Sequence, residues 1–328
     1  MLRIFAALVA LISPLPAFAQ CNVAGIESQI APEQLVELDA RATATPFGHG
    51  LYWSATKDGA ELAIIGTMHL PDPRHTALVE RVMPELQKAG VVLVEATLED
   101  QLAMQAYMAE NPDVIGITTG PTLPEQLDAA TWDAIRDAAY SRGVPGFMAA
   151  KMQPWFLSMT LAIPPCAMAS MVAGETGLDG LLMEQAAALD IPVMALEPWQ
   201  DMFALLSAGT FEEQVDALRM SLIAPGIQDA FMVTLVSAYF DENSAYGWLV
   251  SAHMIDFLPD MDRDLFFAQM AELEEQLLYV RNRNWIPVIN DAAQTHDHVF
   301  VAFGAAHLIG DQGVLALLEA DGWSVTRR

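Results

Sequence analysis

Two histidines stand at the same point of two similar segments. Each segment is an apolar, strand-like run that ends in Gly-x-x-His-Leu, with Gly66 and His69 in the first and Gly304 and His307 in the second. A neutral imidazole in such a loop can bind a divalent metal or act as a general base. The alternative is that each histidine only caps its strand or bonds a neighbouring carbonyl. Because ligands gather at the carboxyl ends of strands in open α/β sheets, the repeat favours one active site built around both histidines.

Two glutamates follow two further strand-like runs. Glu95 comes directly after residues 91–94, a strand that we expect to lie beside the one that leads to His69, and Glu197 follows residues 193–196. Two histidines and one carboxylate suit Zn²⁺, Mn²⁺ or Co²⁺ with one position left for water, and a metal-bound water is a nucleophile near neutral pH. We therefore predict His69, Glu95 and His307 as the metal and catalytic residues, and Glu197 as a weaker candidate. The alternative for Glu95 is an ion pair with Arg74 that has little consequence.

Basic side chains are scarce, so an Arg-Asn-Arg-Asn-Trp cluster at residues 281–285 is conspicuous. Arg281 could stabilise an oxyanion with Asn282 beside it, and Arg74, five residues after His69, could hold a substrate carboxylate. The alternative for the cluster is a helix C-terminus whose cations complement the helix dipole. The His-Asp-His run at residues 296–298 lies at the amino end of a strand, about 20 Å from His307, and is predicted to be surface.

The elements around these residues indicate an α/β fold. Asp58-Gly59 between two apolar runs predicts a hairpin, and residues 61–95 read as strand, loop, helix and strand, which is the basis of a parallel sheet. The last segment, from residue 299 to 325, repeats this order, while residues 98–150 and 199–290 are mostly helical. We predict a central mixed, largely parallel sheet with flanking helices and long helical insertions. It contains two similar strand-GxxH-loop-helix-strand units in one domain over residues 20–328.

The N-terminus has the pattern of a cleavable signal peptide over residues 1–19. Arg3 precedes an apolar run, and Ala17-Phe18-Ala19 provides a small-x-small cleavage site. We therefore expect a periplasmic or secreted protein. With 42 acidic and 15 basic side chains the net charge is −27, which speaks against nucleic acid or anionic lipid as a partner.

An uncharged stretch at residues 152–174 is long enough in number to span a bilayer. Pro154 and the pair Pro164-Pro165 would break a spanning helix, so we predict two short buried helices and no transmembrane segment in the mature chain.

Cys21 and Cys166 are the two cysteines of the chain. An even pair in an exported protein suggests a disulfide, and the alternative is a buried free Cys166 beside a flexible Cys21. Neither cysteine has a histidine nearby in sequence, so a thiol nucleophile is not expected. The chain also lacks Gly-x-Ser-x-Gly, His-Glu-x-x-His, P-loop and Gly-x-Gly-x-x-Gly motifs, which speaks against serine esterases, common metalloproteases and nucleotide enzymes.

Taken in order, these pieces resemble the TraB/GumN family, which includes the TIKI proteases of animals. The matching segments are residues 66–69, the strand ending at Glu95, residues 177–179, 193–197, Arg281-Asn282 before Trp285, and 304–310. Val280 stands where related sequences often carry Glu. The resemblance implies a single α/β domain and a metal-dependent hydrolase, with peptidase activity in the animal relatives. It also implies a central site of His69, Glu95 and His307 that Arg281 and Asn282 support. Cys21 and Cys166 resemble the paired cysteines of related exported members.

The expected function is that of an exported metal-dependent hydrolase, a peptidase that acts on a peptide or small-molecule substrate. Two alternatives stay open. One is a binding protein that sequesters a peptide, metal or haem without turnover. The other is metal-free acid–base hydrolysis of a small ester with histidine as the base.

Overall fold

The computed structural model describes residues 21–168, 173–258 and 261–328. The predicted signal peptide, residues 1–19, lies outside this range. A six-stranded sheet is found in the described residues. Its strands are β1 (Tyr52–Lys57), β2 (Ala60–Thr67), β3 (Val91–Val94), β4 (Val193–Ala195), β5 (His298–Gly304) and β6 (Ser324–Arg327).

The sheet is mixed and largely parallel, in the order β4-β3-β5-β2-β1-β6. Strand β5 pairs in parallel with both β2 and β3, and β3 pairs in parallel with β4. The edge strands on the other side, β1 and β6, are antiparallel to their neighbours. This confirms the predicted fold class.

One detail of the predicted sheet is wrong: β3 does not lie beside β2, because β5 lies between them. The physical reason is the composition of β5. Residues 299–303 are all buried, and a strand that is apolar at every position needs both faces covered and both edges paired. The last parallel strand of the chain therefore takes the central place.

The predicted hairpin is present between β1 and β2. Asp58 has a φ of 51° and Gly59 a φ of 95°, so both central residues of the turn are left-handed. This is the turn whose twist matches that of the flanking strands.

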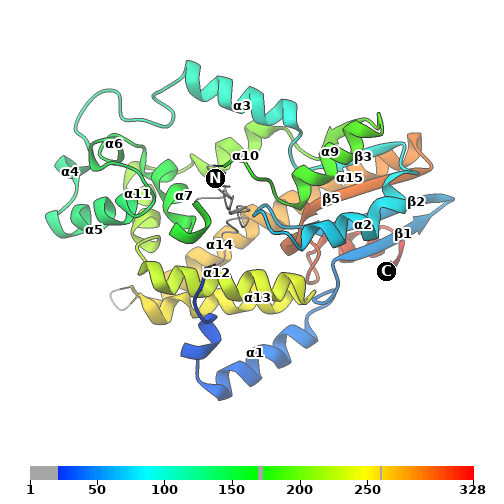
Figure 1. The fold of residues 1–328 in the computed structure, drawn as a ribbon, viewed down its shortest axis with the longest axis horizontal. Coiled ribbons are helices and arrows are strands. Elements are labelled where there is room, and N and C mark those ends of the chain that lie inside the picture. Colours follow the sequence, from blue (N-terminus) through cyan, green and yellow to red (C-terminus); the bar gives the residue numbers. More distant parts are fainter. Residues whose placement is uncertain (1–20, 169–172, 259–260) are drawn as a thin grey trace, which may run out of the picture.

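Helices cover both faces of the sheet (Figure 1). On one face, α2 (His75–Leu86) and α9 (Leu178–Ala188) pack against the sheet through Val82, Leu86 and Leu182. On the other face, α15 (Val280–Thr295) and α16 (Val314–Ala320) form a second apolar layer that contains the fully buried Trp285. Alternate residues of each strand supply the two layers.

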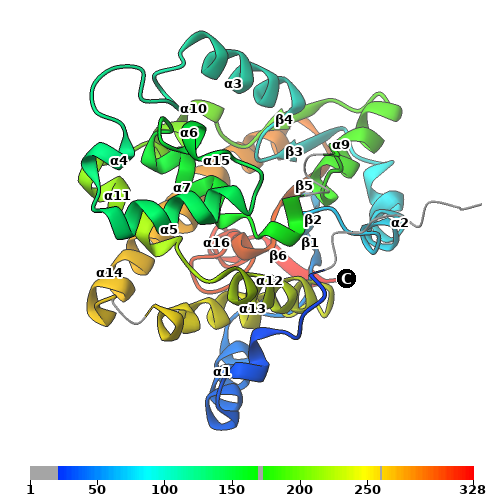
Figure 2. The ribbon, with the colours of Figure 1, turned by 60° about the vertical axis from the view of Figure 1, so that its left-hand side comes forward.

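The remaining helices form the predicted insertions and lie beside the sheet (Figures 1 and 2). Between β3 and α9 come α3 (Leu98–Glu110), α4 (Leu123–Gln126), α5 (Ala129–Tyr140), α6 (Gly146–Ala149), α7 (Pro154–Ala162) and η2 (Pro165–Ala167). Between β4 and α15 come α10 (Trp199–Leu206), α11 (Phe211–Met220), α12 (Pro225–Phe240), α13 (Ser244–Val250), η3 (Ser251–Phe257), α14 (Arg263–Glu274) and η4 (Glu275–Tyr279). The chain before the sheet contains η1 (Ile26–Gln29) and α1 (Pro32–Ala44).

The helix that carries Arg281 does not end there, which corrects one alternative of the sequence analysis. A π-helical turn, η4, joins α14 to α15, and the helix runs on to Thr295. Arg281 therefore lies in the first turn of α15, not at a C-terminus that needs cations. π-Helical turns of this kind are frequent at functional sites.

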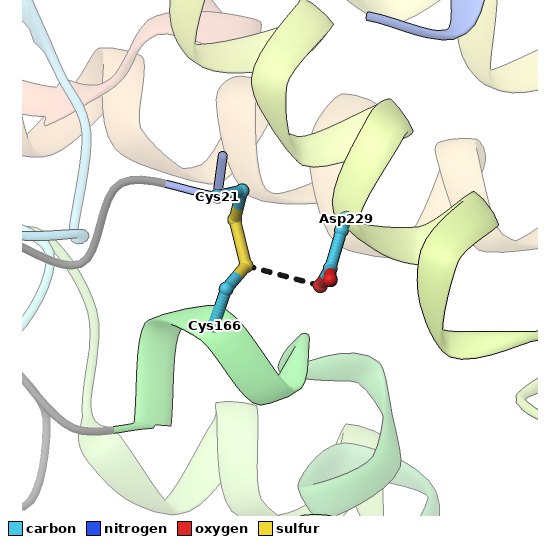
Figure 3. A group of neighbouring side chains, drawn as sticks. All are labelled: Cys21, Cys166 and Asp229. Carbon is cyan, nitrogen blue, oxygen red and sulfur yellow. Dashed lines mark hydrogen bonds between the residues drawn. A yellow bond between two sulfur atoms is a disulfide. The ribbon is translucent and has the colours of Figure 1, made fainter. Parts of the chain in front are cut away.

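Cys21 and Cys166 form a disulfide that joins the start of the described chain to η2 (Figure 3). Cys166 Sγ also lies 3.0 Å from Asp229 Oδ1 of α12. Because the two sulfurs are bonded to each other, neither is a thiolate that could act as a nucleophile or hold a metal.

Within the described ranges, no single helix has the length and apolar character needed to cross a membrane. Helices α11 and α12 together pass that test by length and composition, but they meet at an angle of 79°. Of the uncharged stretch at residues 152–174, the described part contains two short helices: α7, which ends at Ala162, and η2, which begins at Pro165.

Candidate functional site

Four parallel strands bring the predicted residues to one edge of the sheet. Thr67 of β2 pairs with Gly304 of β5, and Val94 of β3 pairs with Ala302 of β5 and Ala195 of β4. Residues that follow these strand ends share that edge. They are His69, Glu95, Glu197 and His307, as the sequence analysis expected.

Arg281 is the centre of a buried ion-pair network. Its Nη2 donates to Glu95 Oε2 at 2.6 Å and to Glu197 Oε1 at 2.5 Å, and its Nε donates to Glu197 Oε1 at 2.8 Å. Trp285 Nε1, one turn along α15, donates to the second oxygen of Glu197. Glu197, the weaker candidate, thus holds Arg281 in place rather than facing a ligand alone.

His307 is buried and fixed by two residues of α15. Asn282 Nδ2 donates to the carbonyl of Gln312, so its Oδ1 is the acceptor for His307 Nδ1, at 2.6 Å. Arg281 Nη1 lies 3.2 Å from His307 Nε2 and donates to it. Burial lowers the pKa of His307 to about 4, with help from the positive charge of Arg281. His307 is therefore neutral at pH 7 and carries its proton on Nδ1.

His69 is the exposed member of the site, with 65% of its side chain accessible. Its Nδ1 lies 3.1 Å from Asp179 Oδ1, and its Nε2 lies 4.0 Å from Glu95 Oε1. The Asp179 carboxylate, aided by Glu95, raises the pKa of His69 to about 9. At neutral pH His69 is therefore an imidazolium whose Nε2–H is available to a ligand.

Glu95 is ionised and surrounded by donors. Its Oε1 accepts the backbone N–H of Gly304 at 2.6 Å, and its Oε2 accepts from Arg281. Burial raises the pKa of Glu95, but His307, Arg281 and His69 outweigh burial and hold it at about 2. Since His307 is neutral above about pH 4, Arg281 and His69 carry this effect at neutral pH.

A cavity of about 430 Å³ lies over His69, Glu95 and Arg281, and His307 is not among the residues that line it. His69, Glu95, Asp179 and Arg281 line it, together with Thr67, whose buried hydroxyl has no hydrogen-bond partner in the described part of the chain. The helical insertions supply the other wall, which consists of Asp100, Gln101, Met104, Met159, Trp199 and Met202. The site thus combines fixed charges, an unpaired hydroxyl and space for a ligand.

The donors fit a three-ligand metal site only in part. Both histidines are anchored through Nδ1, by Asp179 and Asn282, which is the usual arrangement around metal-binding histidines. However, Arg281 donates to Nε2 of His307. Among the described residues, suitable atoms of His69, Glu95 and His307 do not gather within 4.8 Å of one another. As arranged, the guanidinium of Arg281 holds the place that an ion shared with His307 would need.

Arg74 lies outside this group. Its guanidinium donates to both oxygens of Asp72, at 2.9 and 2.7 Å, and stacks on Phe240 at 3.8 Å. It lines a different cavity, of about 410 Å³, which Met68 and Leu70 also line. The ion-pair partner of Glu95 is thus Arg281 and not Arg74.

Two histidines outside the site, His298 and His75, have structural partners. His298 lies at the amino end of β5, where its Nδ1 is 3.6 Å from Glu61 Oε2, far from the site as expected. His75 is buried, and its Nε2 lies 2.9 Å from the Leu70 carbonyl. Since Nε2 can donate to that oxygen, His75 helps to hold the loop that carries His69.

The sequence analysis did not single out Asp179, Thr67 or the apolar wall. A signal for Asp179 existed, because an acidic residue opens a helix in the Gly177-Leu178-Asp179 segment. Its role became visible only when that helix was placed beside His69.

The comparisons with known proteins bear on this site as a whole. Residues 51–327, which include every strand and all the site residues, match the TraB/PrgY/gumN family. The chain belongs to this family. No curated protein and no solved structure matches the chain. Family membership confirms the resemblance seen in the sequence, and the chemistry of the site has to be argued from its geometry.

Proposed function

We propose that this TraB/PrgY/gumN family protein is an exported hydrolase that cleaves peptide bonds by proton transfer between substrate, His69 and Glu95. The observation that carries the proposal is the setting of His69. Its ring is anchored by Asp179, its pKa is raised to about 9, and its Nε2 lies 4.0 Å from an ionised Glu95 in an open cavity. The disulfide supports export, because such bonds persist in oxidising compartments.

The proposed reaction uses two groups with separated pKa values, the usual mark of an acid and its partner. A water attacks the carbonyl carbon while Glu95 accepts its proton, and the C–N bond then breaks as His69 gives its Nε2 proton to the leaving nitrogen. Glu95 returns the water's proton to His69, which restores both residues. The products are a carboxylic acid and an amine.

Arg281 supports this chemistry by keeping Glu95 ionised and oriented. Its own pKa is raised by Glu197 and Glu95 against burial, so its positive charge is permanent.

Metal dependence is a second version of the proposal, supported by the chemistry of the donors. Mn²⁺, Co²⁺ or Zn²⁺ would be held by His69 and Glu95, and by His307 if Arg281 gave up its hydrogen bond to Nε2. Such an ion would polarise the substrate carbonyl. Metal analysis of the purified protein, with activity measured after chelation and after each ion is added back, separates the two versions. Activity that survives chelation supports proton transfer, and activity that only an added ion restores supports the metal.

The test of hydrolysis itself is isotopic. The protein is incubated with a defined mixture of synthetic peptides in H₂¹⁸O, and the products are analysed by mass spectrometry. The proposal predicts fragments whose new carboxyl group carries one ¹⁸O atom. Peptides that are bound in stoichiometric amounts but stay intact would contradict it and would support the sequestering alternative.

A further inference from the structure

The helical insertions supply an apolar wall of the cavity over His69. Met104 of α3, Met159 of α7, and Trp199 and Met202 of α10 line it, whereas His69, Glu95 and Asp179 follow β2 and β3 or belong to α9. Polarisable methionines and an indole are well suited to hold apolar side chains of varied shape. Charged groups and the apolar wall thus line one cavity, and all the charged groups except Asp100 lie outside the insertions that form the wall.

Aromatic contacts behind the apolar wall hold Trp199, its largest side chain, in place. Trp199 packs against Tyr107 of α3 at a ring distance of 5.5 Å and against Phe203 of α10 at 6.1 Å. Phe203 in turn packs edge-on against the buried Trp155 of α7 at 5.4 Å. Helices α3, α7 and α10 are therefore joined through one aromatic cluster, and side-chain freedom lost on ligand binding is small at Trp199.

The charge of the cavity excludes one class of ligand. The carboxylates that line it are Glu95, Asp100, Asp179 and Glu197, and the cations are Arg281 and protonated His69. Four negative and two positive charges leave a formal charge of −2. An acidic side chain beside this surface would be repelled, because like charges in a partly enclosed site are only weakly screened.

We infer that the site selects peptides with a large apolar side chain next to the cleaved bond and rejects peptides with an acidic side chain there. This inference rests on the proposed function for its reaction but concerns binding. Met159 is the best residue to test it, since 42% of it is accessible and it takes no part in the aromatic cluster. Removing an apolar contact of this size changes discrimination by about tenfold.

The experiment uses hexapeptides that differ at one central position, which is leucine, phenylalanine, alanine, lysine or glutamate. The ratio kcat/KM is measured with the wild type, with Met159→Glu and with the matched control Met148→Glu. Met148 is 52% accessible on α6 and does not line the cavity. We expect the wild type to prefer leucine and phenylalanine over alanine by about tenfold, and over glutamate by more. Met159→Glu should lose about tenfold on the leucine peptide and improve on the lysine peptide, while Met148→Glu should match the wild type.

A binding arm separates this inference from the proposed function. Calorimetric titration of the same peptides into His69→Gln measures affinity without turnover, and Met159→Ala replaces Met159→Glu if the charged variant unfolds. Preferential binding of leucine and phenylalanine peptides supports the inference even if nothing is hydrolysed. Hydrolysis or binding with no preference among the five peptides overturns the inference, and hydrolysis without preference leaves the proposed function standing.

Discussion

His69 owes its chemistry to the two carboxylates beside it. Because its pKa is raised to about 9, the imidazolium that acts as the acid is present at neutral pH and is lost as the pH rises through 9. We predict a pH profile of kcat/KM with an alkaline limb near pH 9. In Asp179→Asn this limb should move down towards the ordinary histidine value near 6.5. A limb that stays at the same pH in the variant would contradict the assigned role of Asp179.

The pKa of His307 is shifted in the opposite direction, and we expect it to affect the stability of the protein at low pH. Burial depresses its pKa to about 4, so the folded protein binds no proton there while the unfolded chain does so below about pH 6.5. As the pH falls from 6.5 towards 4, protonation of this histidine in the unfolded chain lowers the free energy of unfolding by at most about 3 kcal/mol. Above pH 6.5 this loss of stability is absent. Urea unfolding at pH 7 and pH 4.5 measures it. The fall in unfolding free energy should be smaller in His307→Gln, and an equal fall in both proteins would show that His307 does not contribute.

Gly177 sets the distance between helix α9 and the loop that carries His69. Leu178 N donates to the Met68 carbonyl at 3.0 Å. A Cβ on Gly177 would lie 2.2 Å from that carbonyl oxygen and 2.4 Å from the carbonyl carbon of His69. We expect Gly177→Ala to push the loop away from Asp179, with a loss of about 1 to 3 kcal/mol of stability and most of the activity.

Gly226→Ala is the matched control for this element. Gly177 is the N-cap residue of α9, and Gly226 lies in the first turn of α12, where a Cβ would meet nothing within 4 Å. Its stability should be unchanged or slightly increased. Activity in Gly177→Ala that equals that of Gly226→Ala would show that α9 does not position His69.

The strands of the site were predictable, whereas their order was not. Residues 91–94 and 299–303 read as strands because each is a short apolar run rich in β-branched residues, bounded by turns. The position of β5 between β2 and β3 depends on tertiary packing. It could not be predicted, because the local sequence does not indicate which distant strands will pair. The sequence left a helix C-terminus at the Arg281 cluster open as an alternative, whereas the helix continues through a π-helical turn to Thr295.

For the whole molecule, the disulfide ties the start of the described chain to the insertion beside the site. It links residues that are 145 positions apart, and disulfides typically stabilise a protein by about 2 to 4 kcal/mol. We predict that a reductant lowers the Tm by about 4 to 10 °C. The Cys21→Ser/Cys166→Ser double variant should already have the lower Tm and show no further change. An equal shift in wild type and variant would mean that the reductant acts elsewhere.

At this scale the sequence indicated the polar half of the site and missed the apolar half. His69, Glu95 and His307 follow strand ends, where a rule about parallel sheets applies. Met104, Met159 and Met202 stand in long helical insertions, where methionine is ordinarily a core residue. Only the packing of α3, α7 and α10 beside the sheet places them over His69.

The most direct test of the central claim is the rate of peptide hydrolysis in His69→Gln compared with His298→Gln. Both histidines are exposed and lie beside a glutamate, but His298 lies at the opposite edge of the sheet. The account predicts that His69→Gln loses at least about a hundredfold in kcat with an unchanged Tm, and that His298→Gln keeps the wild-type rate. Equal rates in the two variants would contradict the account.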